Sequence, residues 1–524
     1  MNRTFDAIVI GSGFGGAITA CRLAEKGMKV LVLERGRRWT PREYPRKPTD
    51  PWLYSVDHAA RLNGWLDLRF FKDVTVAQAA GVGGGSLSYS SVAVEADPAL
   101  FTHGWPAEIT HDELKPYYAR VSEMMNLQVV PDGQLTQRFK LAAEAADRLG
   151  HGPRFSKAPL AVTFSPDWNY QLEDPFHAKH SRTFTNAHGQ QQGTCIHLGN
   201  CDIGCDVRAK NTLDLNYIPR AEQLGAEVRP LHLVRLIEPS DTGYRVVFDR
   251  VEQGQLIRGE ERGARVFLAA GSLGSTELLL RCRDEHRTLP RLSRRLGRKW
   301  SANANVLSMA LYEDADRVRQ TSGPTISALI DFMDGSANGQ KFVIEDDGFP
   351  NVLLNSLQAC LDDGVKTDFG SAFLRHVEDH VRREGRIQHL MVWLGAGMDA
   401  ADGELSLKRA RSKPPALQLR WSVERSRAVV EAILALHQRM TEVTGGHLLP
   451  NPAWSLFKSL LTLHPLGGCA IGVTPATGVV DHRGEVFGYP GLYIVDGAIL
   501  PASVGRNPSH TIAALAERMA AQVN

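Results

Sequence analysis

The sequence predicts an α/β fold, α+β overall, and three local patterns support this prediction. Residues 5–10 and 28–33 are short apolar, β-branched runs, which are typical of buried parallel strands. Residues 14–27 between them have helical spacing with small residues, so the three segments form a Rossmann-like βαβ unit. Residues 265–272 and 492–497 are further apolar runs that end in a small-residue turn or an acid, as strands of such a sheet do.

The turn inside this βαβ unit predicts a dinucleotide site. Gly11 permits a tight turn, Gly13 lets the backbone approach a pyrophosphate, and Gly16 lets helix and strand pack closely. Glu34 follows Gly13 by 21 positions, at the end of the second strand, where a carboxylate accepts hydrogen bonds from ribose hydroxyls. The alternative is a tight turn without a ligand, but strand, glycines, helix, strand and acid all fall in register.

A second glycine cluster, at residues 81–87, favours FAD over NAD. Its sequence is Gly-Val-Gly-Gly-Gly-Ser-Leu. Successive glycines let the main chain lie against a bulky planar ligand and present amides to it. A flexible loop is the alternative interpretation.

Size, charge and cysteine usage limit the class of protein. A chain of 524 residues is expected to form two domains, and a net charge of +2 with no basic block argues against nucleic acid as a partner. No apolar run is long enough to span a bilayer, and a first strand starting at Phe5 leaves no room for a signal peptide. Seven scattered cysteines suit a reduced, cytoplasmic protein.

Three of the cysteines raise the question of a metal site. Cys195, Cys201 and Cys205 are spaced unlike the usual zinc patterns, and His197 is the only other good ligand nearby. We therefore expect buried or loop thiols and no metal. Cys469 is expected to be a small core residue.

The C-terminal part of the chain carries two motifs that suit alcohol oxidation. Residues 463–469 read Leu-His-Pro-Leu-Gly-Gly-Cys, and residues 505–508 read Gly-Arg-Asn-Pro. Oxidation of an alcohol on a flavin removes the hydroxyl proton and transfers a hydride to flavin N5. Histidine is the natural proton acceptor, and asparagine can hold the substrate oxygen without taking a proton. Taken singly, each residue would more often be structural.

Together these segments resemble the glucose–methanol–choline (GMC) oxidoreductase family, and within it the bacterial cholesterol oxidases. The similarity is densest in residues 5–40, 80–95, 201–236, 264–280 and 460–520. The resemblance implies an FAD-binding Rossmann-like domain and a discontinuous substrate domain built on a mostly antiparallel sheet with helices. It assigns residues 1–40, 205–295 and 475–524 to the first, and residues 41–204 and 296–474 to the second.

The resemblance also implies the site residues. His464 would accept the proton and Asn507 would hold the substrate oxygen. FAD would be bound non-covalently, with its adenine near Val234 at the end of a strand over 226–236. The implied cofactor-binding residues are Gly11, Ser12, Gly13, Phe14, Gly15, Gly16, Glu34, Gly83, Gly84, Gly85, Ser86, Tyr89, Val234, Asp496, Gly497, Asn507 and Pro508.

Two departures from the cholesterol oxidase pattern limit this comparison. Tyr89 stands where those enzymes have an asparagine, which alters the surroundings of the flavin. No acid aligns with their isomerisation glutamate, and residues 386–390 are the nearest match. Glu345 is a substitute acid or base, although a solvated acidic turn is the expected environment of Glu345-Asp346-Asp347. The sequence therefore supports oxidation but not isomerisation.

Other segments give coarser expectations. Residues 211–224 and 423–440 are predicted core helices, and prolines 41, 45, 48 and 51 mark the first crossing between domains. Residues 65–71 and 454–457 are apolar and suit either ordinary core or lids over a lipophilic cavity. As lids, they would let a substrate enter from a membrane surface by peripheral contact.

The leading hypothesis is an FAD-dependent oxidase or dehydrogenase of a hydrophobic alcohol, such as a 3β-hydroxysteroid, with oxygen or another electron acceptor. A GMC dehydrogenase of a non-steroid alcohol or sugar, with a quinone or haem acceptor, is the alternative within the family. A redox-silent flavin-binding lyase or scaffold is the alternative from another class.

Overall fold

The computed structural model of the chain describes residues 4–47, 49–350, 386–410, 413–450, 454 and 458–523. Its first layer is a seven-stranded sheet in which the order β10-β11-β12-β1-β2-β9 is extended by β22 pairing with β12. Strands β1 (Thr4–Ile10), β2 (Val30–Leu33), β9 (Glu227–Arg229) and β22 (Leu492–Ile494) run parallel to their neighbours. Strands β10 (His232–Ser240), β11 (Gly243–Glu252) and β12 (Gln255–Leu268) form an antiparallel meander.

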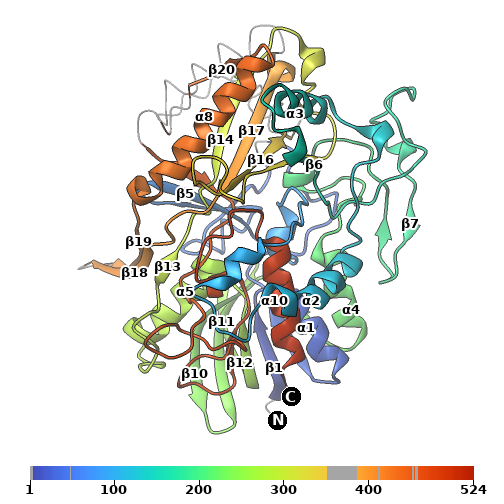
Figure 1. The fold of residues 1–524 in the computed structure, drawn as a ribbon. Coiled ribbons are helices and arrows are strands. Elements are labelled where there is room, and N and C mark those ends of the chain that lie inside the picture. Colours follow the sequence, from blue (N-terminus) through green and yellow to red (C-terminus); the bar gives the residue numbers. More distant parts are fainter. Residues whose placement is uncertain are drawn as a thin grey trace.

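Helix α1 (Phe14–Glu25) joins β1 to β2 and confirms the predicted βαβ unit. It packs against α10 (Ser509–Ala521) and α4 (Tyr217–Gln223), and α10 in turn packs against α2 (His111–Met124), as Figure 1 shows. The approach of α1 is close because a Cβ on Gly16 would lie 2.0 Å from the carbonyl oxygen of Gly11. Helix α5 (Gly271–Leu280) follows β12 directly.

A second, antiparallel sheet lies above the first in Figure 1. Its order is β20-β14-β17-β16-β15-β6, and every pairing in it is antiparallel. Helices α8 (Arg427–Val443) and α3 (Gln137–Arg148) pack against it. Its strands are β6 (Phe155–Lys157), β14 (Val306–Leu311), β15 (Ala328–Asp331), β16 (Phe342–Asp347), β17 (Leu390–Gly397) and β20 (His447–Leu448).

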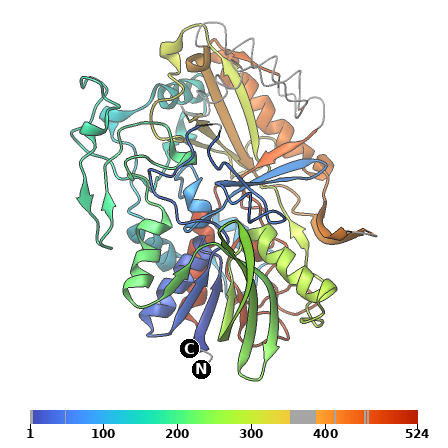
Figure 2. The same ribbon diagram turned by 180° about the vertical axis from the view of Figure 1, so that it is seen from behind.

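Smaller sheets complete the molecule. Strands β3 (Leu53–Tyr54), β4 (Leu66–Phe70), β5 (Val74–Ala79) and β21 (Leu460–Thr462) form one, and β13 (Arg298–Trp300), β18 (Gly403–Ala410) and β19 (Lys413–Arg420) form another. A two-stranded sheet pairs β7 (Phe184–Thr185) with β8 (Gln191–Gln192). Figure 2 shows the hairpin β18–β19 projecting from the side of the molecule. The predicted fold class is confirmed, whereas the residue boundaries of the two domains stay a prediction.

Three predicted elements differ in detail. The strand predicted over 226–236 is two strands, β9 and β10, because Pro230 has no N–H for a ladder and Leu231 turns the chain with φ 60°. The helix predicted over 211–224 is a 3-10 turn followed by α4, since Asn216 breaks the helix and its side chain accepts a hydrogen bond from the Tyr217 amide. The helix predicted over 423–440 begins as a 3-10 turn and continues as α8 to Val443.

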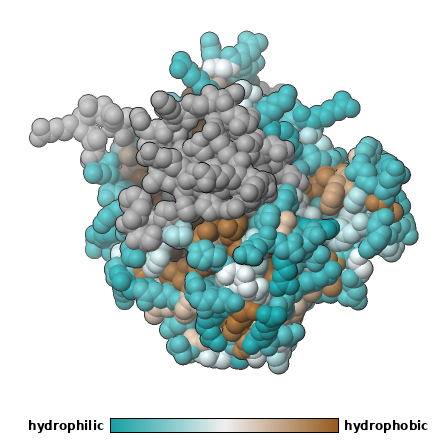
Figure 3. Space-filling model, turned by 90° about the horizontal axis from the view of Figure 1, so that it is seen from above, coloured by the Kyte–Doolittle hydropathy of each residue, from teal (hydrophilic) through white to brown (hydrophobic). Residues whose placement is uncertain are grey.

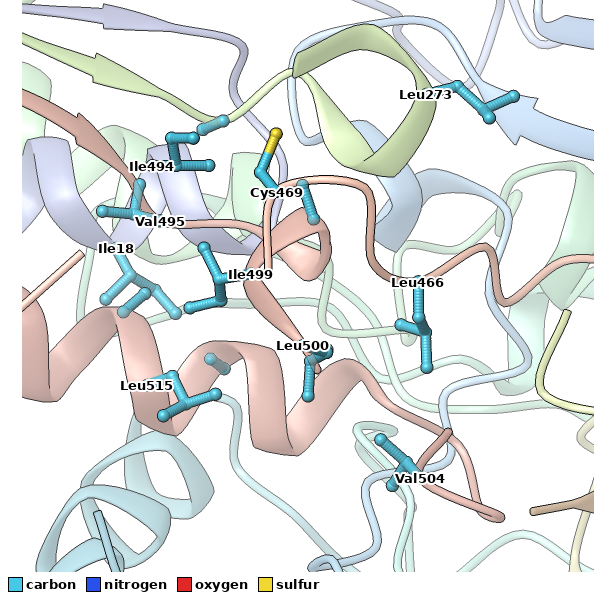
Figure 4. Packing of buried hydrophobic residues seen from close by; sticks show 14 of the residues in the cluster. Ile18, Leu273, Leu466, Cys469, Ile494, Val495, Ile499, Leu500, Val504 and Leu515 are labelled. Carbon is cyan, nitrogen blue, oxygen red and sulfur yellow. The ribbon is translucent and has the colours of Figure 1, made fainter. Parts of the chain in front are cut away.

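The hydrophobic core reaches both C-terminal motifs. Figure 4 shows Leu466 and Cys469 in the same buried cluster as Ile494, Ile499 and Val504. Cys469 is fully buried, so the prediction that it is a core residue is confirmed. Packing on this cluster anchors residues 463–469 and 503–508, which lie far apart in sequence.

The surface is mixed in character. Figure 3 shows mostly hydrophilic residues on the described part of the upper face, with hydrophobic residues exposed between them. Within the described residues, no helix is both long and apolar enough to cross a membrane.

Candidate active site

A cavity of about 310 Å³ is lined by the first glycine turn, the second glycine cluster and both C-terminal motifs. The N-termini of α1, α5 and α10 all open onto it, because Phe14, Gly271 and Ser509 line its wall. Helix N-termini attract negative charge through their unpaired amides and the helix dipole. The predicted site residues on its wall are Gly11, Ser12, Gly13, Phe14, Gly15, Glu34, Gly84, Gly85, Tyr89, Val234, His464, Asp496, Gly497, Asn507 and Pro508.

Three predicted cofactor residues do not line this cavity. Gly16 is buried against β1, which fits the packing role that we predict for it. Gly83 and Ser86, which the resemblance implies as cofactor-binding residues, are not part of the cavity wall. The Ser86 hydroxyl donates to the Gly83 carbonyl at 2.7 Å and accepts from the Leu213 amide at 3.0 Å, so it holds the turn together.

Glu34 ties the two glycine segments together. Its carboxylate accepts hydrogen bonds from the Ser12 hydroxyl at 2.7 Å, the Ser12 amide at 3.0 Å and the Gly36 amide at 2.8 Å. The Ser12 hydroxyl also accepts from the Gly83 amide at 3.1 Å. The acid that the sequence predicts for a ribose therefore lies on the cavity wall and also orders the turn.

Asp496 organises the start of α5. Its carboxylate accepts from the Gly271 amide at 2.8 Å, the Ser275 hydroxyl at 2.5 Å and the Ala498 amide at 2.8 Å. Burial raises its pKa, and these three donors act in the opposite direction.

His464 follows β21 and lines the cavity. Its Nδ1 lies 3.0 Å from Asn305 Nδ2. The Thr462 hydroxyl lies 2.8 Å from Asn305 Oδ1 and 2.8 Å from the Ala302 carbonyl oxygen, and its single proton is shared between these two acceptors. Because an amide N–H donates to Nδ1, the neutral ring carries its own proton on Nε2. Burial lowers the His464 pKa to about 4, so the ring is neutral at neutral pH.

Asn303 connects the two C-terminal motifs and was missed in the sequence. Its Nδ2 donates to the Arg506 carbonyl at 2.8 Å and lies 3.5 Å from His464 Nδ1. Its Oδ1 accepts from the amides of Val504 and Gly505 at 3.1 and 2.8 Å. The available signal was the Asn-Ala-Asn sequence at 303–305, between two apolar runs.

The expected solvated acidic turn at 345–347 is wrong for Glu345. Glu345 lies on β16, is only 1% exposed, and its Oε2 accepts a hydrogen bond from Asn507 Nδ2 at 3.3 Å. Among the described residues, Glu345 Oε1 and Asn507 Oδ1 have no hydrogen-bond partner. Burial raises the Glu345 pKa to about 8, and the nearby Asp346 carboxylate raises it further. Residues 386–390, the nearest sequence match to the isomerisation glutamate, do not line the cavity.

Residues 65–71, predicted as either core or a lid, include both buried and exposed side chains. Trp65 is fully buried between Trp39 and Tyr44, whereas Phe70 is exposed. Of residues 454–457, Ser455, Leu456 and Phe457 lie outside the described residues. Cys195, Cys201 and Cys205 line a small pocket away from His464, and no described group of three or more His, Cys, Asp or Glu side chains could hold a metal.

The residues of the large cavity fit FAD. A Cβ on Gly13 would make only ordinary contacts, with Gly84 Cα at 3.8 Å and Gly85 N at 3.9 Å, so the wall is open at the position where the sequence predicts a pyrophosphate. The glycine turn, the Glu34 carboxylate and the helix N-termini form one continuous wall with His464 and Asn507. The unpartnered Asn507 Oδ1 is a buried polar atom that a ligand can satisfy.

Comparison with known proteins agrees with this geometry. Residues 399–516 match the GMC oxidoreductase family, and residues 9–65 match an NAD(P)-binding Rossmann-like domain. The chain is 31% identical to a cholesterol oxidase of Mycobacterium tuberculosis over 99% of its own length and 91% of the relative's length. The protein belongs to the GMC oxidoreductase family. It is an FAD-dependent alcohol oxidoreductase.

Other GMC-type relatives extend the comparison. A cholesterol oxidase of Acinetobacter baumannii is 29% identical, with 99% of this chain and 94% of the relative covered. The crystal structure of pyridoxine 4-oxidase from Mesorbium loti matches with a TM-score of 0.63 at 16% identity, covering 99% of this chain and 98% of that one. At that identity the structural match supports the fold alone.

Proposed function

We propose that this GMC oxidoreductase oxidises the CH–OH group of a hydrophobic alcohol, such as a 3β-hydroxysteroid, with oxygen as the electron acceptor. The observation that carries the proposal is that His464 and Asn507 share one cavity wall with the glycine turn and Glu34. The 31% identity to a cholesterol oxidase supports the steroid class of substrate. Bound FAD supplies the hydride acceptor, at N5 of its flavin ring.

Two residues would hold the substrate hydroxyl. The Nε2–H of His464 can donate to the alcohol oxygen, because Asn305 already occupies Nδ1. The unpartnered Oδ1 of Asn507 can accept from the hydroxyl. Both contacts position the oxygen and leave the carbinol C–H free to face the flavin.

Two side chains, His464 and Glu345, are candidates to accept the hydroxyl proton. His464 can take it on Nε2 only after its own proton moves to Nδ1, which requires Asn305 to release that nitrogen. In its ionised form Glu345 needs no such change: its carboxylate accepts from Asn507, which lines the cavity, and its Oε1 has no partner, although Glu345 itself is not part of the cavity wall. We therefore propose Glu345 as the additional base that the sequence left open.

The pH dependence of flavin reduction distinguishes these acceptors. With a Glu345 pKa of about 8, the carboxylate fraction rises through one half at about pH 8 and levels off above about pH 9. The anaerobic rate constant should therefore rise between about pH 6 and 9, and Glu345→Gln should remove the rise and lower the high-pH rate roughly 10²-fold. A rise that persists in Glu345→Gln would exclude Glu345 as the base.

Anaerobic mixing with alcohols tests the proposed function itself. Bleaching of the flavin absorbance by a 3β-hydroxysteroid supports the proposal. Bleaching by sugars or small polar alcohols alone would favour a GMC dehydrogenase with a quinone or haem acceptor, and bleaching by no alcohol would favour the redox-silent reading.

The route of the substrate completes the proposal. Leu461 and Leu463 line the cavity and are 42% and 47% exposed, so its mouth is apolar. We propose that the protein works in the cytoplasm and takes its substrate from a membrane surface by peripheral contact at this mouth.

A further inference from the structure

Lys210 is a buried charge that the proposed reaction does not use. Its side chain is 1% exposed, and its Nζ donates to the carbonyl oxygens of Leu87 at 2.9 Å and Cys201 at 2.6 Å. Within the described residues, no carboxylate lies within ion-pair distance of this ammonium. Leu87 ends the second glycine cluster, so the ammonium is fixed to the segment that is predicted to contact the flavin.

Tyr89 contacts the Lys210 ammonium and also lines the cavity. Lys210 Nζ lies 4.8 Å from the centroid of the Tyr89 ring, in a cation–π contact. Tyr89 lines the cavity, whereas Lys210 does not. Phe14 packs edge-on against the ring at 5.5 Å, and the Tyr89 hydroxyl donates to the Asn211 carbonyl at 2.8 Å. The ring is thus fixed on one side by Phe14 of the cavity wall and contacts the ammonium.

The surrounding groups leave Lys210 charged at neutral pH. Burial lowers its pKa to about 8, and the neighbouring carboxylates of Asp202 and Asp214 oppose that fall. Burial raises the pKa of both neighbouring thiols and of the Tyr89 phenol, so these three groups are neutral. Asp202 lies on the cavity wall, where it accepts from the Ser90 hydroxyl at 2.9 Å, and burial raises its pKa to about 6.

We propose that Lys210, acting through the Tyr89 ring, is a positioning residue that raises the reduction potential of the bound flavin. A flavin gains negative charge on reduction, and a fixed cation behind the cavity wall stabilises that charge. The proposal rests on the flavin placement beside residues 84–89 that the proposed function assumes.

Sulfite binding to the holoenzyme tests this without any alcohol, because the flavin–sulfite adduct is also anionic. Lys210→Met should weaken the affinity for sulfite roughly tenfold, the size expected of one charge about 12 Å from the flavin at an effective dielectric of about 20. The two-electron reduction potential of the flavin should also fall, by about 30 mV for each tenfold decrease in the equilibrium constant of its reduction. Lys157→Met is the matched control, because Lys157 also bonds a backbone carbonyl but lies away from the cavity. It should change neither quantity.

Lys210→Arg keeps the test decisive if the methionine variant loses FAD. In the wild type, sulfite affinity should drop further as pH rises through about 8 and Lys210 loses its proton. Arginine stays charged, so this additional drop should vanish in the variant. Unchanged potential and sulfite affinity in an FAD-loaded Lys210→Met protein, or the same pH response in Lys210→Arg, would overturn the proposal. No alcohol is used in these measurements, so their result can be told apart from a failure of the proposed alcohol oxidation.

Discussion

His464→Ala is expected to keep its FAD and to lose flavin reduction by alcohol, by roughly 10²–10⁴-fold. The variant removes the Nε2–H that would hold the alcohol oxygen, while the nucleotide end of the cavity is untouched. Anaerobic stopped-flow absorbance measures the rate constant directly, and the flavin-to-protein ratio of the purified variant reports on cofactor binding.

His437→Ala is a suitable control for this experiment. His437 is also fully buried, but it bonds to Ser308 on the second sheet and does not line the cavity. We expect this control to unfold at a lower temperature while reducing its flavin at the normal rate. Near wild-type reduction in His464→Ala would remove the histidine from the mechanism.

Gly13→Val is expected to yield a folded protein without FAD. A Cβ at position 13 makes only ordinary contacts, 3.8 Å from Gly84 Cα and 3.9 Å from Gly85 N, so we expect the variant to fold. The cofactor does not, because the isopropyl group occupies the place of the pyrophosphate. The absorbance ratio of flavin to protein measures the loss, and circular dichroism checks the fold.

Gly133→Val provides the matched substitution, since a Cβ at Gly133 meets open space and the residue lies outside the cavity. That variant should stay yellow. A yellow, fully loaded Gly13→Val protein would show that the phosphates lie elsewhere.

The nucleotide end of the site could be predicted because its signals are local. The strands at 5–10 and 28–33 and the glycine turn lie within one stretch of chain, and periodicity with glycine spacing defines them. The boundaries failed where a polar side chain replaced a backbone partner, as at Asn216. The sequence predicts that Gly83, Gly84, Gly85 and Ser86 all contact the cofactor, because it does not reveal which face of a short turn points inward. In the structure only Gly84 and Gly85 line the cavity.

The chemical end depended on contacts that no local pattern encodes. Three acids in a row predict an exposed turn at residues 345–347. In the structure Glu345 accepts a hydrogen bond from Asn507, and Asp346 accepts from the backbone amides of Ser327 and Ala328. Asn303 and Asn305 act on residues about 160 positions away in the sequence. Long-range polar contacts of this kind become visible only once the fold brings the segments together.

The pairing of β22 with β12, and of α10 with α1, bears on biosynthesis. On the ribosome, the amino-terminal strand and glycine turn emerge early, but their neighbours at 492–521 emerge hundreds of residues later. Until then the edge of β12 at 266–268 has no partner and the wall that holds Asp496 and Asn507 is missing. The wall that lines this cavity is therefore complete only after residues 492–521 have emerged from the ribosome.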